Sequence, residues 1–172
     1  MSEQQPITID EIVSEVKQTQ PGADINLILS AYELASEAHE GQKRVSGEAY
    51  IIHPLNVAYI LADMHLDEAA ISAALLHDVV EDTDLTFDDL KAKGIPDEVI
   101  GPLRYLTHDP AVPYTDYIEH IAEDPVATKV KISDLTHNMD ETRYCRPMTE
   151  YEAARQEKYR KSKEFLLSRL PS

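Results

Sequence analysis

The segment ALLHDVVEDT, residues 74–83, places imidazole and carboxylate side chains directly behind an apolar run. Buried charged groups are costly unless a group of opposite charge accompanies them. No lysine or arginine occurs between Arg44 and Lys91, so the neighbouring sequence supplies no cation for Asp78. Imidazole nitrogens and carboxylate oxygens are common ligands of divalent metal ions. The segment therefore predicts a metal ion held by His77 and Asp78.

The dipeptide His-Asp occurs twice, and its two contexts lead to different predictions. His108-Asp109 precedes Pro110 at the end of an expected helix, where Asp109 is typical of a turn. His77-Asp78 lies in a segment expected to be a buried helix, where no turn is needed. A lone histidine is more often a satisfied core or surface residue than a ligand, so only the second pair is assigned to a metal.

Two further ligands must come from elsewhere in the chain. His53 precedes Pro54 at a loop-to-helix junction, and Asp134 lies on an otherwise apolar face of an expected helix. His137 is three residues from Asp134 on the same face, and is either a fifth ligand or a partner that orients the ligands. Two histidines and two carboxylates suit Mn²⁺ or Fe²⁺ well, and Zn²⁺ less distinctively. The predicted metal ligands are His53, His77, Asp78 and Asp134.

Two acids follow the His-Asp pair by one helical turn. Glu81 and Asp82 lie four residues beyond His77 and Asp78 respectively. A divalent ion lowers the pKa of bound water from about 15.7 towards about 7, and a nearby carboxylate can take or return the proton. The alternative is that these acids are solvated charges at a helix end. Acids are unfavourable at the C-terminal end of a helix, however, so their clustering there favours a compensating cation.

The charge of the chain is unevenly distributed. The 172 residues carry a net charge of −16, which argues against a protein that binds duplex nucleic acid. Residues 1–142 carry 8 basic and 28 acidic residues, whereas residues 143–172 carry 8 basic and 4 acidic ones. The simplest interpretation is a solvated acidic surface with a basic last helix. A phosphorylated ligand would need local Lys, Arg or metal charge.

Composition indicates a soluble intracellular protein. The chain is 42% hydrophobic and 28% charged, and no stretch approaches the roughly 20 apolar residues of a membrane span. The N-terminal sequence MSEQQPITIDEI is polar and acidic, unlike a signal peptide. Cys145 is the single cysteine and cannot form an internal disulfide, which fits a reducing cytoplasm. Whether copies of the chain form a homo-oligomer stays open.

Helical periodicity dominates, and strand-like alternation is scarce. We expect an all-α, compact bundle of about nine helices that forms a single domain over residues 1–172. The segment EGQKRVSGEAYIIHP, with two glycines and a proline, is expected to be a loop. The expected helices cover residues 8 to about 18, 24–40, 54 to about 64, 68–82, a short stretch between Thr86 and Gly94, 96 to about 106, 114–122, 125–140, and 149 to about 170.

Three longer segments resemble a known family. AHEGQKRVSGEAYIIHP, AALLHDVVEDT and KISDLTHNM resemble, in order and spacing, the three hydrolase motifs of the RelA/SpoT family within the HD-domain metal-dependent phosphohydrolases. The best match is to the stand-alone small alarmone hydrolases, which remove the 3′-pyrophosphate from (p)ppGpp using Mn²⁺. The resemblance covers about residues 25–165. It implies an HD-domain-like fold, Mn²⁺ as the cofactor and a small-molecule nucleotide, (p)ppGpp, as the substrate.

The resemblance also implies roles for individual residues. The positions of the family's metal ligands are His53, His77, Asp78 and Asp134. The positions of its water-activating pair are Glu81 and Asp82. The positions that contact the base and sugar of the nucleotide are Arg44, Ser46 and Asn138. Lys131 is assigned to positive charge near the phosphates.

Several basic positions of the family motifs are changed in this chain. Val45 stands where a basic residue is usual, Leu135 replaces an arginine, and the acids Asp140-Glu141 replace Arg-Thr. Ala49 replaces a proline. A highly charged substrate therefore meets fewer cations than the family pattern supplies. Either Arg143 and Arg146 compensate from one turn further on, or the substrate is a less highly charged nucleotide.

The leading hypothesis is a metal-dependent phosphohydrolase that converts (p)ppGpp to GDP or GTP plus pyrophosphate. A chain of 172 residues leaves no room for a synthetase domain, so we expect it only to degrade alarmones. One alternative is a hydrolase of another nucleotide, such as NADPH or a nucleoside phosphate. Another is a non-catalytic nucleotide- or metal-binding module. A third is a helical protein whose polar cluster is only a buried hydrogen-bond network.

Overall fold

The computed structural model describes residues 6–44, 47–140 and 147–170. In these ranges the chain forms helices and one isolated β-bridge, between Lys43 and Ala49. The helices are α1 (Ile9–Thr19), α2 (Ile25–Ala38), α3 (Ile52–Asp63), α4 (Glu68–Leu76), α5 (Val79–Asp82), α6 (Phe87–Ala92), α7 (Asp97–Leu106), α8 (Tyr114–Ile121), α9 (Pro125–Asn138) and α10 (Glu150–Arg169). Because α5 is a single turn, the expected all-α bundle of about nine helices is confirmed over the described ranges.

Polar side chains cap the beginning of most of these helices. Each capping oxygen accepts a hydrogen bond from a main-chain N–H of the first turn, which would otherwise lack a partner, and stabilises the helix by about 1 kcal/mol. Thr86 and Thr149 form reciprocal capping boxes with Asp89 and Glu152. Thr8, Asp24, Asp67 and Asp124 cap α1, α2, α4 and α9 with their side chains.

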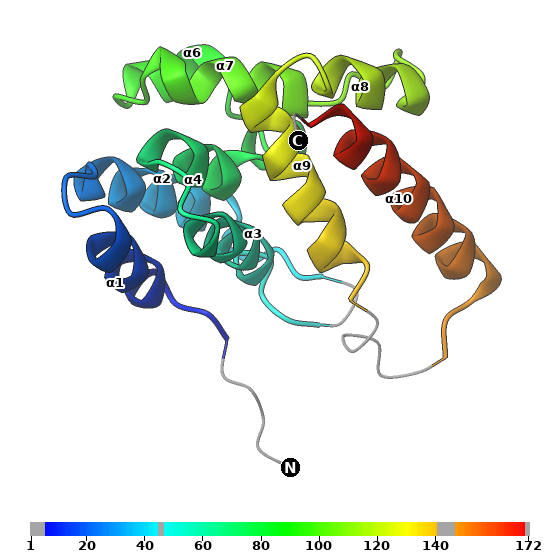
Figure 1. Ribbon diagram of the computed structural model, residues 1–172, viewed down its shortest axis with the longest axis horizontal. Coiled ribbons are helices and arrows are strands. Elements are labelled where there is room, and N and C mark those ends of the chain that lie inside the picture. The colour runs from blue at the N-terminus through cyan, green and yellow to red at the C-terminus, as the bar shows by residue number, and fades with distance from the viewer. Residues whose placement is uncertain (1–5, 45–46, 141–146, 171–172) are drawn as a thin grey trace.

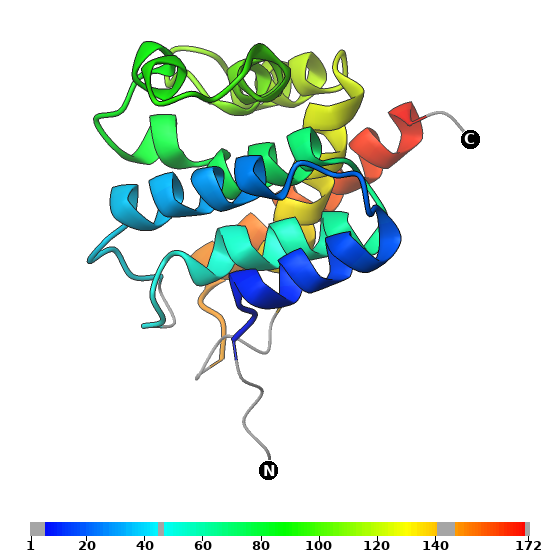
Figure 2. The same ribbon diagram turned by 90° about the vertical axis from the view of Figure 1, so that its left-hand side faces the viewer.

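Helices α4 and α9 lie at the centre of the bundle. α4 packs against α2, α3, α7 and α9, and α9 also packs against α3, α7, α8 and α10. In Figure 1, α6, α7 and α8 lie across the top of the molecule, and α10 runs beside α9. Figure 2 shows the blue, cyan and green ribbons of α1 to α4 stacked beneath that upper layer. None of the helices in the described ranges has the length and apolar character needed to cross a membrane.

The all-round apolar character of α4 reflects its position in the core. Every residue from Ala70 to Leu76 is buried, and the side chains of Ile71 and Leu75 are fully enclosed. Burial of apolar surface is the main favourable term in folding, so this helix anchors the others. Its C-terminal end is therefore a rigid place from which to present His77 and Asp78.

The prediction of one continuous helix over residues 68–82 is wrong at one point. α4 ends at Leu76 and α5 begins at Val79. Asp78 has a ψ of −3°, which takes the main chain out of the α-helical path. The imidazole Nδ1 of His77 lies 2.6 Å from the carbonyl oxygen of Ala74, while the main-chain nitrogen of His77 is 3.4 Å from the same oxygen. The His77 side chain thus donates to a carbonyl oxygen that would otherwise accept a main-chain hydrogen bond of the helix.

Candidate metal centre

Three separate elements bring the four predicted ligands together. His53 is in the first turn of α3, His77 and Asp78 form the connection between α4 and α5, and Asp134 is on the third turn of α9. One ligand atom from each of the four lies within 4.8 Å of the others. His53, His77 and Asp134 are buried and Asp78 is half-buried. The structure therefore gathers four groups that could hold a metal ion.

The surroundings of His77 direct a lone pair of electrons at this cluster. Its Nδ1 lies 2.6 Å from the Ala74 carbonyl oxygen, so this nitrogen must carry a proton and donate it. A neutral imidazole then has an unprotonated Nε2, which lies 3.1 Å from an oxygen of Asp78 and 3.2 Å from one of Asp134. Three acceptors cannot face one another without a cation or a proton between them. A divalent cation fits this donor set.

His53 is oriented in the same manner by a second histidine. Its Nε2 lies 2.7 Å from Oδ1 of Asp134, and its Nδ1 lies 2.7 Å from Nδ1 of His137. If Nδ1 of His53 donates to His137, Nε2 is left to face the cluster. His137 thus contacts the outer nitrogen of His53 and is not one of the four clustered groups. This arrangement favours the role of an orienting partner over that of a fifth ligand.

The charges of the clustered side chains strongly shift one another's pKa values. Burial lowers the pKa of His77, but Asp78 and Asp134 outweigh burial and raise its pKa well above the ordinary value. Burial raises the pKa of Asp134, but Lys131 and then His77 hold that pKa well below the ordinary value. The Nζ of Lys131 is 2.9 Å from Oδ2 of Asp134. Burial raises the pKa of Asp78 as well, but His77 outweighs burial and lowers that pKa, so both carboxylates are ionised at neutral pH.

Metal binding should be visible in the stability of the protein. A ligand at about 100 times its Kd stabilises the folded state by about 2.7 kcal/mol, which corresponds to about 5–10 °C in Tm for a domain of this size. We expect Mn²⁺ added to EDTA-treated protein to raise Tm by this amount, measured by differential scanning fluorimetry. An unchanged Tm, with no metal bound after dialysis, would mean that the cluster is only a hydrogen-bond network.

The two acids predicted to activate water, Glu81 and Asp82, are not among the four clustered groups. Glu81 accepts a hydrogen bond from the main-chain N–H of His108 at 3.1 Å and lines a cavity of about 250 Å³. The protein packed around it and the charge of Asp78 raise its pKa above the ordinary value. The same two causes raise the pKa of Asp82, which lies towards Tyr50. A raised carboxyl pKa suits a group that must take up and return a proton.

Two of the residues predicted to contact the substrate border the same cavity. Lys131 and Asn138 line it, and both donate hydrogen bonds to Asp134. The guanidinium of Arg44 donates to Oδ1 of Asn138 at 2.6 Å, which joins the loop after α2 to α9. Of the predicted substrate-contacting residues, Ser46 and Arg143 lie outside the described residues, as does Arg146.

The changed motif positions differ in their relation to the cavity. Leu135 is fully buried in the hydrophobic core and is not among the residues that line the cavity. A leucine here therefore fills the core and does not line the cavity. Asp140 is exposed just after α9. Val45 and Glu141 lie outside the described residues.

Sequence reasoning missed several residues of the site. Tyr50 donates a hydrogen bond to Oδ2 of Asp78 at 2.5 Å, and so helps to hold that carboxylate. The basic last helix contributes Lys158 and Tyr159 to the cavity wall. The excess of positive charge after residue 142 was the available signal, but it did not indicate which residues turn inwards. The remaining wall is formed by His108, Tyr114 and Tyr117.

Comparison with known proteins finds a family match and two similar curated proteins that agree with the motif resemblance. The HD domain family profile matches residues 31–100. The chain is 43% identical over 122 residues to a guanosine-3′,5′-bis(diphosphate) 3′-pyrophosphohydrolase of Aquifex aeolicus, covering 65% of this chain and 17% of that protein. It is 38% identical over 148 residues to the bifunctional (p)ppGpp synthase/hydrolase SpoT of Escherichia coli, covering 80% of this chain and 21% of that protein.

A solved structure has a fold similar to that of this chain over most of both chains. It is described as a metazoan ortholog of SpoT that hydrolyzes ppGpp, and it aligns with a TM-score of 0.70 at 28% identity. The alignment covers 82% of this chain and 85% of that one. The chain spans about a fifth of the length of the curated relatives described above. It carries an HD domain, and its relatives are the (p)ppGpp hydrolases of the SpoT and Rel type.

Proposed function

We propose that this chain is a Mn²⁺-dependent guanosine 3′,5′-bis(diphosphate) 3′-pyrophosphohydrolase. It would convert ppGpp to GDP, or pppGpp to GTP, with release of pyrophosphate. The observation that carries the proposal is the position of the His-Asp cluster beside the cavity that Glu81, Lys131 and Asn138 line. Relatives 38–43% identical to the chain are named for this activity or for (p)ppGpp synthesis and hydrolysis.

The reaction consumes one water molecule and breaks the bond between the 3′ oxygen and its phosphorus. A divalent ion bound by His53, His77, Asp78 and Asp134 would polarise the phosphate and lower the pKa of the attacking water. Glu81 would accept the proton of that water and return it to the leaving 3′ oxygen. The His108 N–H holds the Glu81 carboxylate in place for this transfer.

The basic residues would position the nucleotide. The ammonium of Lys131 lies between Asp134 and the cavity, where it would stabilise negative charge that develops on the phosphate oxygens. The hydrogen bond from Arg44 to Asn138 holds the guanidinium plane at the cavity margin. A planar guanidinium suits stacking on a purine, so this end of the cavity would take the base. Ser46 and Arg143 are proposed for the same substrate on the motif resemblance alone.

We propose that one hydrolase domain spans residues 1–172, because the described helices share one hydrophobic core. We also propose that the chain acts in the cytoplasm. Its single cysteine, Cys145, is consistent with a reducing compartment. Two imidazoles and two carboxylates without sulfur suit Mn²⁺ or Fe²⁺ better than Zn²⁺, and Mn²⁺ is proposed over Fe²⁺ on the motif resemblance.

Hydrolysis of ppGpp with and without Mn²⁺ tests this function directly. We expect Mn²⁺-dependent release of GDP and pyrophosphate in equal amounts, separated by ion-exchange chromatography. NADPH and GTP serve as parallel substrates. Release of phosphate from either of these, with no release of pyrophosphate from ppGpp, would assign the chain to another nucleotide. Metal binding without turnover of any of the three would favour a binding module.

A further inference from the structure

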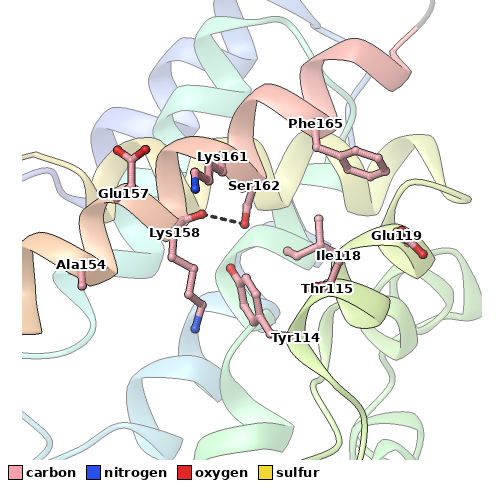
Figure 3. Close-up of a pocket in the computed structure, with 10 residues that line it drawn as sticks. All are labelled: Tyr114, Thr115, Ile118, Glu119, Ala154, Glu157, Lys158, Lys161, Ser162 and Phe165. Atoms are coloured by element: carbon pink, nitrogen blue, oxygen red, sulfur yellow. Dashed lines mark hydrogen bonds between the residues drawn. The ribbon is translucent and has the colours of Figure 1, made fainter.

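A larger cavity adjoins the one that Glu81, Lys131 and Asn138 line. It has a volume of about 490 Å³ and lies between α8 and α10, as Figure 3 shows. Its walls are apolar on one side, formed by Ile118 and Phe165, and carry the ammonium groups of Lys158 and Lys161 on the other. Tyr114 and Lys158 also line the 250 Å³ cavity beside Glu81. The two cavities therefore meet at these two side chains.

Lys158 is placed to contact a ligand that reaches this meeting point. Its Nζ lies 3.9 Å from the centroid of the Tyr114 ring, and Figure 3 shows the side chain extending from α10 beside that ring. A cation–π contact holds an ammonium group but leaves N–H donors for an anion. No carboxylate of the described residues lies within ion-pairing distance of this Nζ. Lys131, by contrast, is already paired with Asp134 at 2.9 Å.

Neither Glu157 nor Glu119, the two acids that border the larger cavity, forms an ion pair with Lys158. Glu157 lines the cavity as well; it forms an ion pair with Arg160 and lies one helical turn before Lys161. Glu119 lies on the opposite side of Tyr114 from Lys158 in Figure 3. Lys161 follows Lys158 by three residues and lies on the same face of the helix. The α10 wall thus carries two lysines in a chain of net charge −16, and Lys158 has no carboxylate partner among the described residues.

We propose that Lys158 is a substrate-binding residue that contacts the 5′-phosphates of the nucleotide, and that the cavity between α8 and α10 receives them. This inference rests on the proposed function. With the 3′-pyrophosphate at the metal centre and the base beside Arg44, the 5′-phosphates are the remaining charged branch of the substrate. The meeting point of the two cavities, where Lys158 lies, is the place that we assign to them. The cations of α10 thereby offset the basic motif residues that the chain lacks.

The experiment compares two substrates on matched variants of the full chain. The substrates are ppGpp and guanosine 3′-diphosphate, which lacks the 5′-phosphates. For Lys158→Ala we expect KM for ppGpp to rise about tenfold, the lower end for a hydrogen bond to a charged group, with kcat changed less than about twofold. KM for guanosine 3′-diphosphate should stay the same. Lys163→Ala removes the same charge from α10 outside both cavities and should leave both values unchanged.

The outcomes separate this inference from the proposed function. A wild-type chain that hydrolyses ppGpp, with a Lys158→Ala penalty equal for both substrates, would overturn the 5′-phosphate contact alone. An equal KM rise in Lys163→Ala would also overturn it, because the effect would then be one of net charge. A wild-type chain inactive on both substrates with Mn²⁺ would overturn the function and the inference together. Lys158→Arg should restore most of the affinity for ppGpp.

Discussion

Replacing Asp78 with alanine is expected to abolish metal binding and turnover together. Asp78 supplies one of two carboxylates in the cluster, and its Oδ2 lies 3.1 Å from Nε2 of His77 and 3.7 Å from Nε2 of His53. Without it, the centre loses a negative charge and one of four ligands, and the remaining set no longer balances a divalent ion. Metal content after Mn²⁺ loading should fall from about one ion per chain to near zero, and ppGpp hydrolysis should fall to the rate of the buffer.

A matched acid tests whether this loss is specific. Asp84 is exposed just beyond α5, so Asp84→Ala changes the net charge by the same amount without touching the cluster. We expect it to bind metal and turn over substrate as the wild type does. Far-ultraviolet circular dichroism of the EDTA-treated proteins would check that Asp78→Ala still folds. A metallated and active Asp78→Ala protein would remove this residue from the ligand set.

Replacing Glu81 with glutamine is expected to separate catalysis from metal binding. The amide oxygen of glutamine can still accept the hydrogen bond that the His108 N–H donates, so the side chain should keep its place. It cannot take up a proton at neutral pH. We expect the rate of ppGpp hydrolysis to fall by about 10²–10⁴-fold, the usual contribution of a positioned acid–base group. Metal content, measured by mass spectrometry, should stay equal to that of the wild type.

Glu98→Gln is the corresponding control, because Glu98 is an exposed acid in the first turn of α7. It should retain full activity. If Glu81→Gln hydrolyses ppGpp at nearly the wild-type rate, the proton-transfer role assigned to Glu81 is wrong. Asp82, whose pKa is raised by the same causes, would then be the next candidate. Loss of metal from Glu81→Gln would instead show that its carboxylate helps to hold the ion.

The fold class was accessible to sequence reasoning because its determinants are local. The caps at Asp24, Asp67, Asp124 and Thr149 and the periodic apolar residues are properties of short segments. Each of these helices begins where expected, and those after Asp24, Asp124 and Thr149 also end close to the expected residue. The helix break after Leu76 was not predicted. It depends on a single hydrogen bond from the His77 ring to a carbonyl of its own helix, which competes with the main chain.

The chemistry of the centre was also accessible from the sequence, because buried acids without a neighbouring cation imply a missing partner. The motif resemblance also indicated that His53 and Asp134, which are 81 residues apart in the chain, belong to one set of ligands. Neither source could decide the role of His137. Two histidine rings meet Nδ1 to Nδ1 only because α3 packs against α9 with one particular rotation. The tertiary structure made His137 a contact of His53.

The sequence by itself determined that the chain is all-α, that two histidines and two aspartates could bind a metal ion, that two acids follow one of these pairs, and that the last helix is basic. Tertiary structure alone decided which faces of those helices meet. Helical periodicity states which residues share a face but not what that face contacts. Leu135 was therefore interpreted as a lost substrate contact, yet it packs in the core. The basic last helix was interpreted as surface charge; Lys158 is indeed exposed, but the packing of α10 against α8 and α9 places it where two cavities meet.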